Sequence, residues 1–275
     1  MDRCAPTRTL LLPGPIVTGV SMWGHRQALR LLVSRELQQK YRNYRLGYLW
    51  AILEPLGMSV TMWFVFQVLL GGRRLGEHPY FLFLTVAILP WWWFTNSISA
   101  STKVFQGNTR PLVASLLPTE FMVARVLFTR MGDFLLSLPL VVVAMLITWT
   151  FPGPLIVLFP VAMLIQLILM YGLSLFVASI SAVVPDFARV VRIVLRAAFY
   201  LTPVLYAVSN IPKAARAIAP FNPLVGILSL YRLGWWGNEH EGWKAYGISF
   251  AIVAATVVLG IVVFKRLEGR ILKEA

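Results

Sequence analysis

The strongest constraint on the fold is an apolar run from Leu46 to Leu70 that contains one Glu and no Lys, Arg or Asp. A helix rises about 1.5 Å per residue, so this run is longer than the roughly 30 Å hydrocarbon core of a bilayer. Before it, between His25 and Arg45, apolar residues recur every three or four positions among six basic residues. That pattern is typical of a helix lying in a membrane interface, from which the chain enters the bilayer.

The composition agrees with a chain that crosses the membrane several times. Hydrophobic residues make up 58% of the 275 residues and charged residues 13%, and the mean hydropathy is +0.73. The net charge of +14 does not indicate nucleic-acid binding, because the basic residues punctuate apolar runs instead of gathering on a soluble face. We therefore expect an all-α integral membrane protein with one membrane domain and no nucleic-acid partner.

The apolar runs predict six transmembrane helices within a membrane domain at 46–265. A flexible tail at 1–23 and an amphipathic interface helix at 24–45 precede it, and a tail at 266–275 follows. The segment 210–242 is too polar and too rich in proline to cross, so it predicts short re-entrant or interfacial helices between spans five and six. The expected spans are about 47–70, 79–102, 121–150, 155–184, 193–208 and 243–264.

The distribution of Lys and Arg predicts the orientation. Nineteen of the 25 fall on the side that holds both termini, and six fall on the other side. Because basic residues concentrate in cytoplasmic segments, both termini are expected in the cytoplasm of a multi-pass protein of the bacterial inner membrane.

Catalytic motifs are absent from the sequence. It has no phosphate-binding glycine loop of the G-x-x-x-x-G-K-[ST] type and no H-E-x-x-H zinc motif, and its three histidines all lie outside the predicted spans. No metal site is predicted. The ionisable residues within the spans are Glu54, Arg130 and Asp133. Arg130 and Asp133 are three residues apart on one helix, which favours a structural ion pair over a functional one.

One set of motifs resembles a known family, the ABC-2 polysaccharide-export permeases. The run Tyr41 to Trp50 with Pro55 and Leu56 is similar to its entry motif Y-R-x-S-x-L-G-x-L-W-x-x-x-x-P-L, with Tyr44 where the family usually has serine. Further landmarks follow in the same order, and together the likeness covers 25–270. They are Leu89-Pro90-Trp91, Leu201-Thr202-Pro203-Val204-Leu205-Tyr206, Ile211-Pro212 and Phe221-Asn222-Pro223-Leu224.

The resemblance implies a half-transporter, not an enzyme, that passes a polyprenyl-pyrophosphate-linked glycan outward. Two copies of the chain would work as a homodimer with two ATPase subunits, which would bind ATP and Mg; the chain itself would hold no cofactor. The residues expected to couple to the ATPase lie in the interface helix and in the turn before the fifth span: Arg30, Arg35, Tyr41, Arg42, Asp186, Arg189 and Arg192. Candidate pyrophosphate contacts are Arg45 and Arg196, since arginine suits phosphate recognition.

Three consecutive tryptophans, Trp91, Trp92 and Trp93, are candidates to line the glycan path. They lie roughly 17 to 18 Å or more along the second span, near the middle of the bilayer, where interfacial anchoring does not explain tryptophan. An indole ring offers an apolar plate for the C–H face of a sugar. Packing between helices is an equal alternative for each of them. Phe64 and Tyr206 are further candidates nearer the outer face.

Two other functions remain open at this stage. An integral-membrane transferase acting on lipid-linked sugars would need a general base or a carboxylate cluster for a metal, and none is visible. A membrane scaffold that recruits a partner through its basic cytoplasmic surface is the third alternative. An ATPase that copurifies with the chain and responds to a glycolipid would favour the exporter over both.

The orientation can be tested by labelling with an impermeant thiol reagent on intact cells. Single cysteines at positions 76 and 238, in a chain without Cys4, are expected to react because both positions lie outside the cytoplasm. Labelling at positions 107 and 269 instead would invert the topology.

Overall fold

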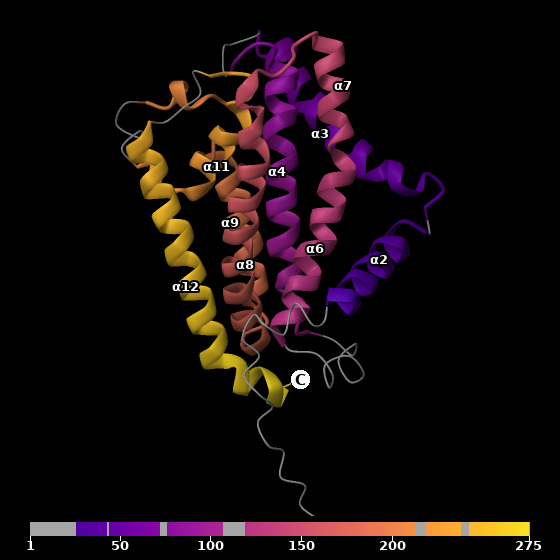
Figure 1. The fold of residues 1–275 in the computed structure, drawn as a ribbon, viewed down its shortest axis with the longest axis vertical. Helices are drawn as coiled ribbons and strands as arrows, with labels where there is room; N and C mark the ends of the chain where they lie inside the picture. The colour runs from indigo at the N-terminus through magenta and orange to yellow at the C-terminus, as the bar shows by residue number, and fades with distance from the viewer. Residues whose placement is uncertain are drawn as a thin grey trace, which may run out of the picture.

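The chain folds into a bundle of helices (Figure 1). The computed structural model describes residues 26–42, 44–71, 76–106, 119–212, 218–237 and 242–274. Throughout these ranges the secondary structure is helical, without a strand. α4 (Tyr80–Ser101), α6 (Thr119–Ser137) and α8 (Leu158–Val183) run side by side along the long axis of the bundle. The all-α membrane fold expected from the sequence is confirmed, while the tail predicted at 1–23 lies outside the described residues.

Five helical stretches among the described residues are long and apolar enough to cross a membrane. They are Gly47–Leu69, Tyr80–Ser101, Thr119–Thr148, Pro154–Val183 and Lys244–Ile271. α9 (Phe187–Leu201) lies where the fifth of six spans was predicted, but its 15 residues extend only about 22 Å. That is shorter than the roughly 30 Å hydrocarbon core, so the count of six spans stays a prediction.

Several of these stretches contain a break in the α-helix. The first consists of the 3₁₀ turn η1 (Gly47–Leu49), α3 (Trp50–Phe64) and the π-helical η2 (Val65–Leu69). The third divides into α6 and α7 (Pro139–Thr148), because a proline inside a helix removes a backbone hydrogen bond and favours a new first turn. The fourth begins with η3 (Pro154–Val157), which leads into α8.

Two helices end at other residues than the sequence predicted. α9 stops at Leu201 and not near 208, because Thr202 is extended, with ψ 140°, and a residue before proline avoids the helical region. α12 (Trp243–Glu274) continues beyond the predicted end of the sixth span at 264. Lys, Arg and Glu are good helix formers, so the helix persists where the hydrophobic pattern stops.

The segment between α9 and α12 contains one helix buried inside the bundle. After the short turns η4 (Val208–Asn210) and η5 (Ala219–Phe221), α11 (Pro223–Arg232) packs against α4, α8 and α12. All of its residues from Leu224 onward are buried. Of the two alternatives predicted here, this burial fits a re-entrant helix and not one lying on the surface.

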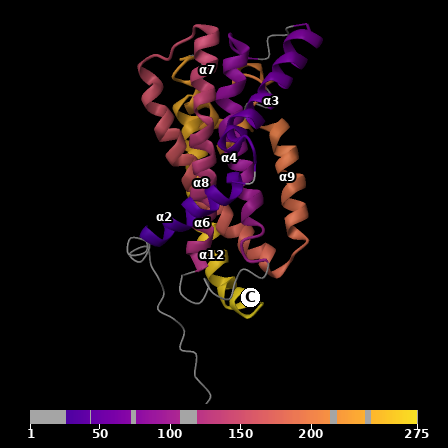
Figure 2. The same ribbon diagram turned by 90° about the vertical axis from the view of Figure 1, so that its right-hand side faces the viewer.

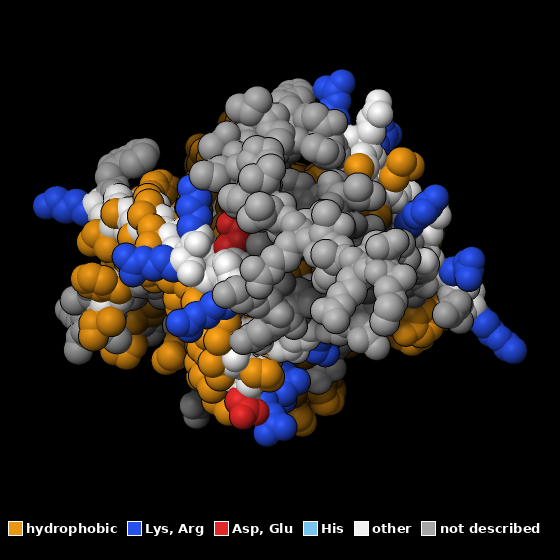
Figure 3. Space-filling view, turned by 90° about the horizontal axis from the view of Figure 1, so that it is seen from below, with side chains coloured by type: hydrophobic (Ala, Val, Ile, Leu, Met, Phe, Trp, Pro, Cys, Tyr) orange, Lys and Arg blue, Asp and Glu red, His pale blue; other side chains and the backbone are white. Residues whose placement is uncertain are grey.

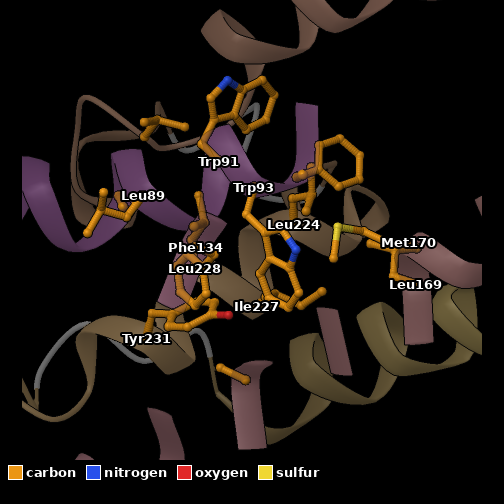
Figure 4. Packing of buried hydrophobic residues seen from close by; sticks show 14 of the residues in the cluster. Leu89, Trp91, Trp93, Phe134, Leu169, Met170, Leu224, Ile227, Leu228 and Tyr231 are labelled. Atoms are coloured by element: carbon orange, nitrogen blue, oxygen red, sulfur yellow. The ribbon is translucent and has the colours of Figure 1, made fainter. Parts of the chain in front are cut away.

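α4 is the central helix of the bundle. It contacts α3, α6, α7, α8, α9 and α11, and each side chain from Leu82 to Trp91 is buried. Figure 4 shows buried residues of α4 beside Met170 of α8 and Leu224 of α11. A helix that is apolar on every side is one enclosed by protein. α4 therefore holds the helices around it in place, while α3 and α7 expose apolar residues on the outside of the bundle.

Two glycines bring α8 and α12 into close contact. A Cβ atom added at Gly172 would lie 2.5 Å from the Cα of Val257, and one added at Gly260 would overlap the carbonyl oxygen of Gly172. Small residues allow membrane helices to approach closely enough for backbone packing. The small residues Ser174 and Ala178 of α8 are buried as well, but the close approach to the backbone of α12 is at Gly172.

We expect Gly260→Ala to destabilise the protein by about 1–3 kcal/mol, because the added methyl group forces the two backbones apart. Gly247→Ala in the same helix is the matched control, since a Cβ atom there meets nothing within 4 Å and alanine favours the helix. The thermal unfolding midpoint of the purified chain in detergent measures both. Equal midpoints for the two variants would contradict the close packing.

The structure also refines the labelling positions named above. A Cβ atom at Gly76 would approach Cε1 of Phe83 to 2.5 Å, so Glu77 is the better neighbouring position for a cysteine. Positions 107 and 238 lie outside the described residues.

Candidate functional site

The amphipathic helix α2 (Arg26–Arg42) is bound to α6 through one carboxylate. Lys40 Nζ lies 2.7 Å from Asp133 Oδ2, and the hydroxyl of Tyr41 donates to Asp133 Oδ1 at 2.8 Å. Arg130 Nη1 donates to the same carboxylate at 3.1 Å, which confirms the ion pair predicted from the sequence. Asp133 thus does more than neutralise a neighbour on its own helix, because it also binds α2. Figures 1 and 2 show α2 crossing the bundle obliquely beside α6.

Tyr41 is the buried residue of α2, with 4% of its surface exposed. Burial raises the pKa of its phenol well above the ordinary value of 10.0, and the hydrogen bond to the Asp133 carboxylate raises that pKa further. The hydroxyl therefore stays protonated at physiological pH and acts as a donor. A role of Tyr41 in coupling to the ATPase would have to act through Asp133, since its side chain faces the bundle.

A small cleft of about 40 Å³ lies beside this cluster. Glu54 of α3 and Trp92 and Asn96 of α4 line it together with Lys40, Tyr41, Arg130 and Asp133. The charges of Lys40 and Arg130 balance those of Glu54 and Asp133, so these residues give the lining of the cleft no net charge. Nothing in this set resembles a nucleophile activated by a base, and the described residues include no group of three His, Cys, Asp or Glu side chains that could hold a metal.

The three tryptophans of α4 have different surroundings. Trp93 is buried and stacks on Phe134 of α6, with ring centroids 4.7 Å apart, and Trp91 is buried against Phe199 of α9. Figure 4 shows the Trp91 and Trp93 rings pointing to different sides of α4. Trp92 is only partly buried and faces the cleft. Trp93 lines the same cleft although it is buried, so Trp92 is the more exposed of the two tryptophans at the cleft.

The two remaining pathway candidates lie elsewhere. Phe64, at the end of α3, exposes 46% of its surface, and Tyr206 follows α9 and is partly buried. Neither lines the cleft beside Trp92. Of the five predicted pathway residues, Trp92 and Trp93 line this cleft.

The candidate coupling and pyrophosphate residues are exposed, apart from Tyr41. In α2 they are Arg30, Arg35 and Arg42, Arg45 follows that helix, and Arg192 and Arg196 lie on α9. Asp186 and Arg189 form a solvated pair at 3.7 Å, with side chains 83% and 76% exposed. Figure 3, which views the bundle from the end that carries the chain's C-terminus, shows Lys and Arg side chains around the rim. Their exposure suits a partner surface or lipid headgroups, and their roles stay predictions.

Near the opposite end of the bundle, Arg232 of α11 binds the segment that follows α9. Its guanidinium is fully buried and donates to the carbonyl oxygens of Pro203 at 2.7 Å, Val204 at 2.8 Å and Tyr206 at 3.3 Å. The carbonyl of Leu205, between them, accepts from the hydroxyl of Tyr80 at 2.8 Å. Four consecutive carbonyls without helical partners are thus all hydrogen-bonded, as the apolar interior requires.

Two further side chains complete this arrangement. Asn222 accepts a hydrogen bond from the backbone N–H of Leu224 at the start of α11, and its amide donates to Thr202 Oγ1 at 2.9 Å. The face of the Phe83 ring lies 3.5 Å from the Arg232 guanidinium carbon, which is a cation–π contact. Arg232 is one of the six Lys and Arg residues that the sequence assigned to the side opposite the termini. The signal that this assignment overlooked was a single charge in an otherwise apolar run from Leu224 to Leu233.

Comparison with known proteins decides the family. A family model described as "ABC-2 type transporter" matches residues 27–235. The chain belongs to the ABC-2 transporter family. ABC-2 permeases are transport subunits and their ATPase activity is in a separate subunit, so this chain is a non-catalytic membrane subunit that works with an ATPase partner.

The relatives extend over nearly the whole permease. The O-antigen export system permease protein RfbA of Myxococcus xanthus is 32% identical over 240 residues, which cover 86% of this chain and 90% of the relative. A protein of the same name from Klebsiella pneumoniae is 25% identical, covering 88% and 92%. The polysialic acid transport protein KpsM of Escherichia coli is 24% identical, covering 88% and 93%.

The buried arginine of this ABC-2 permease can be tested by removing its donors. Arg232→Met keeps most of the volume and leaves carbonyls of residues 203–206 without partners, each costing about 1–3 kcal/mol. We expect a clearly lower thermal unfolding midpoint in detergent. Arg196→Met is the matched control on an exposed arginine, and a midpoint as high as the control's would contradict the role of Arg232.

Proposed function

We propose that the chain is the permease subunit of an ABC exporter that moves a polyprenyl-pyrophosphate-linked polysaccharide from the cytoplasm to the outer side of the bacterial inner membrane. The observation that carries this proposal is the relationship to O-antigen export permeases along 86% to 88% of the chain. The helical bundle is consistent with it, because it offers apolar spans for the membrane and a polar cleft without catalytic groups.

The proposed exporter contains two copies of this chain and two ATPase subunits, which bind ATP and Mg. Support for a second copy comes from α9, which packs on the bundle through one stripe that includes Val191 and Leu195. Its other side exposes apolar residues such as Ile193 and Val194, 66% and 57% exposed. A pathway bounded by this helix would be closed by the same helix of a second copy.

Both termini are placed in the cytoplasm in this proposal. The basic rim in Figure 3 marks the end of the bundle that would face the ATPase and the inner leaflet. The burial of Arg232 adds support, because it leaves only five of the six basic residues assigned to the outer side as candidates to face water there. Arg45 and Arg196 keep their proposed role as contacts of the pyrophosphate.

Among the tryptophans, Trp92 is the one we place on the glycan path. It combines a partly exposed indole ring with carboxylate and amide groups nearby, which are the partners that sugar hydroxyls use. Trp93 also lines this cleft, but its ring is buried and stacked on Phe134. Trp91 is buried against Phe199 and lines the path only if the helices around it separate during transport.

The alternative of a transferase acting on lipid-linked sugars receives little support. Such an enzyme needs a base or a metal-held activator near the headgroups. In the part of the chain that the structure describes, Glu54 and Asp133 line one cleft, but Asp133 is bound to Lys40, Tyr41 and Arg130. A scaffold role would leave the family's transport architecture unexplained.

The proposal can be tested in the host of origin by deleting the gene. We expect surface polysaccharide to be lost and its polyprenyl-pyrophosphate-linked form to accumulate in the membrane, while the tagged chain copurifies with an ATPase. Unchanged surface polysaccharide would contradict the exporter, and sugar transfer by the purified chain alone would favour the transferase.

Complementation of the same strain separates Trp92 from its neighbour. Trp92→Leu should lower surface polysaccharide without changing the abundance of the chain, because its ring faces the cleft. Trp91→Leu should lower the abundance of the chain, because its ring is core.

A further inference from the structure

We infer that two ion pairs between α2 and α6, called rungs below, hold α2 in one register on α6. The acid lies on α2 in one pair and on α6 in the other, and through these pairs movement of α2 is transmitted into the bundle. Asp133 and Arg125 are the positioning residues on α6. The inference rests on the proposed function, in which α2 meets the ATPase, and it assigns the residues through which α2 acts on the membrane domain.

The first rung joins Glu36 of α2 to Arg125 of α6. Arg125 Nε lies 3.5 Å from Glu36 Oε2. The hydroxyl of Thr129, one turn further along α6, lies 3.4 Å from the same carboxylate oxygen, while its shorter hydrogen bond goes to the carbonyl of Arg125 at 2.9 Å. Here the acid belongs to α2 and the base to α6.

The second rung reverses the charges. Lys40 lies on α2 one turn after Glu36, and its partner Asp133 lies on α6 two turns after Arg125. A shift of α2 by one turn would bring Lys40 toward Arg125 or Glu36 toward Asp133, and like charges repel. The two rungs therefore favour one register and one direction of α2.

Close packing lies between the rungs. A Cβ atom added at Gly132 would approach Cδ1 of Leu37 to 2.7 Å, so α2 rests directly on the backbone of α6 there. Ion pairs set the position and the glycine permits the approach. α2 is thus held at one position on α6 and does not slide freely along it.

The second rung also borders the cleft that contains Trp92 and Glu54. Asp133 binds Lys40 and Tyr41 of α2 and Arg130 of its own helix. A displacement of α2 would pull on α6 at the height of Trp92. This contact links the side where an ATPase would bind to the interior of the bundle.

The cleanest experiment is a charge swap at the first rung, because several groups converge on Asp133. The variants are Glu36→Arg, Arg125→Glu and the double variant that restores the pair. Asp133→Asn tests the second rung, since it removes the charge and keeps an oxygen for Tyr41. Lys244→Glu, an exposed charge reversal at the start of α12, is the control.

Two measurements are made on each variant. The first is hydrogen exchange of the α2 backbone amides in the purified chain. The second is the number of ATP molecules hydrolysed per glycan exported, in vesicles that contain the chain, its ATPase and the lipid-linked glycan. We expect each single rung variant to speed the amide exchange of α2 and to raise the number of ATP molecules per glycan, each by about threefold, the size typical of partly exposed pairs. The double swap should restore both quantities.

The possible results test the register of α2 and the transmission of its movement separately. Unchanged exchange in the single variants, or a double swap as impaired as either single variant, would overturn the register. Faster exchange with an unchanged ATP-to-glycan ratio would overturn transmission through α6. A wild-type complex that hydrolyses ATP and exports no glycan would refute the proposed function and the coupling claim with it, while the exchange measurement would still decide whether the pairs set the register.

Discussion

Backbone carbonyls that leave a helix inside an apolar bundle need donors from the protein, and the part of this permease around α11 depends on that requirement. At Thr202 the chain leaves α9, and the carbonyls of residues 203–206 are bonded by Arg232 and Tyr80. The donors come from α11 and α4, so these hydrogen bonds require both helices to lie beside the segment 203–206. The end of α9, the burial of α11 and the buried charge of Arg232 therefore depend on one another.

The part of the bundle beside α2 depends on a carboxylate in a comparable way. Asp133 binds Lys40 and Tyr41 of α2 and Arg130 of its own helix. Without these partners, burying the Asp133 carboxylate would cost free energy. Between the two polar clusters lies α4, enclosed by other helices. α2 and α9 lie at the sides of this bundle, α2 against α6 and α9 against α4 and α8.

The sequence predicted those parts of the fold that depend on hydrophobic pattern. The spans around α3, α4 and α8 appear close to the expected positions, because lipid and apolar core select the same residues. It did not predict the end of α9, which Thr202 and Pro203 determine locally, nor the helical tail after 264, which hydropathy cannot mark. The Arg130–Asp133 pair was predicted because it is local in sequence. The partners of Arg232 and Asp133 on other helices were not, since they depend on tertiary contacts between distant segments.

Several of these contacts involve residues of the motifs that resemble the family. Asn222 donates to Thr202, Pro203 accepts from Arg232, and Tyr41 donates to Asp133. We propose that this bundle, with an ATPase, carries a lipid-linked polysaccharide outward. The most direct measurement is translocation in sealed vesicles that contain both subunits and a lectin-detectable lipid-linked glycan on the ATPase side. We expect ATP to make the glycan accessible to lectin on the other side only when both subunits are present. Accessibility that is independent of ATP, or equal without this chain, would contradict it.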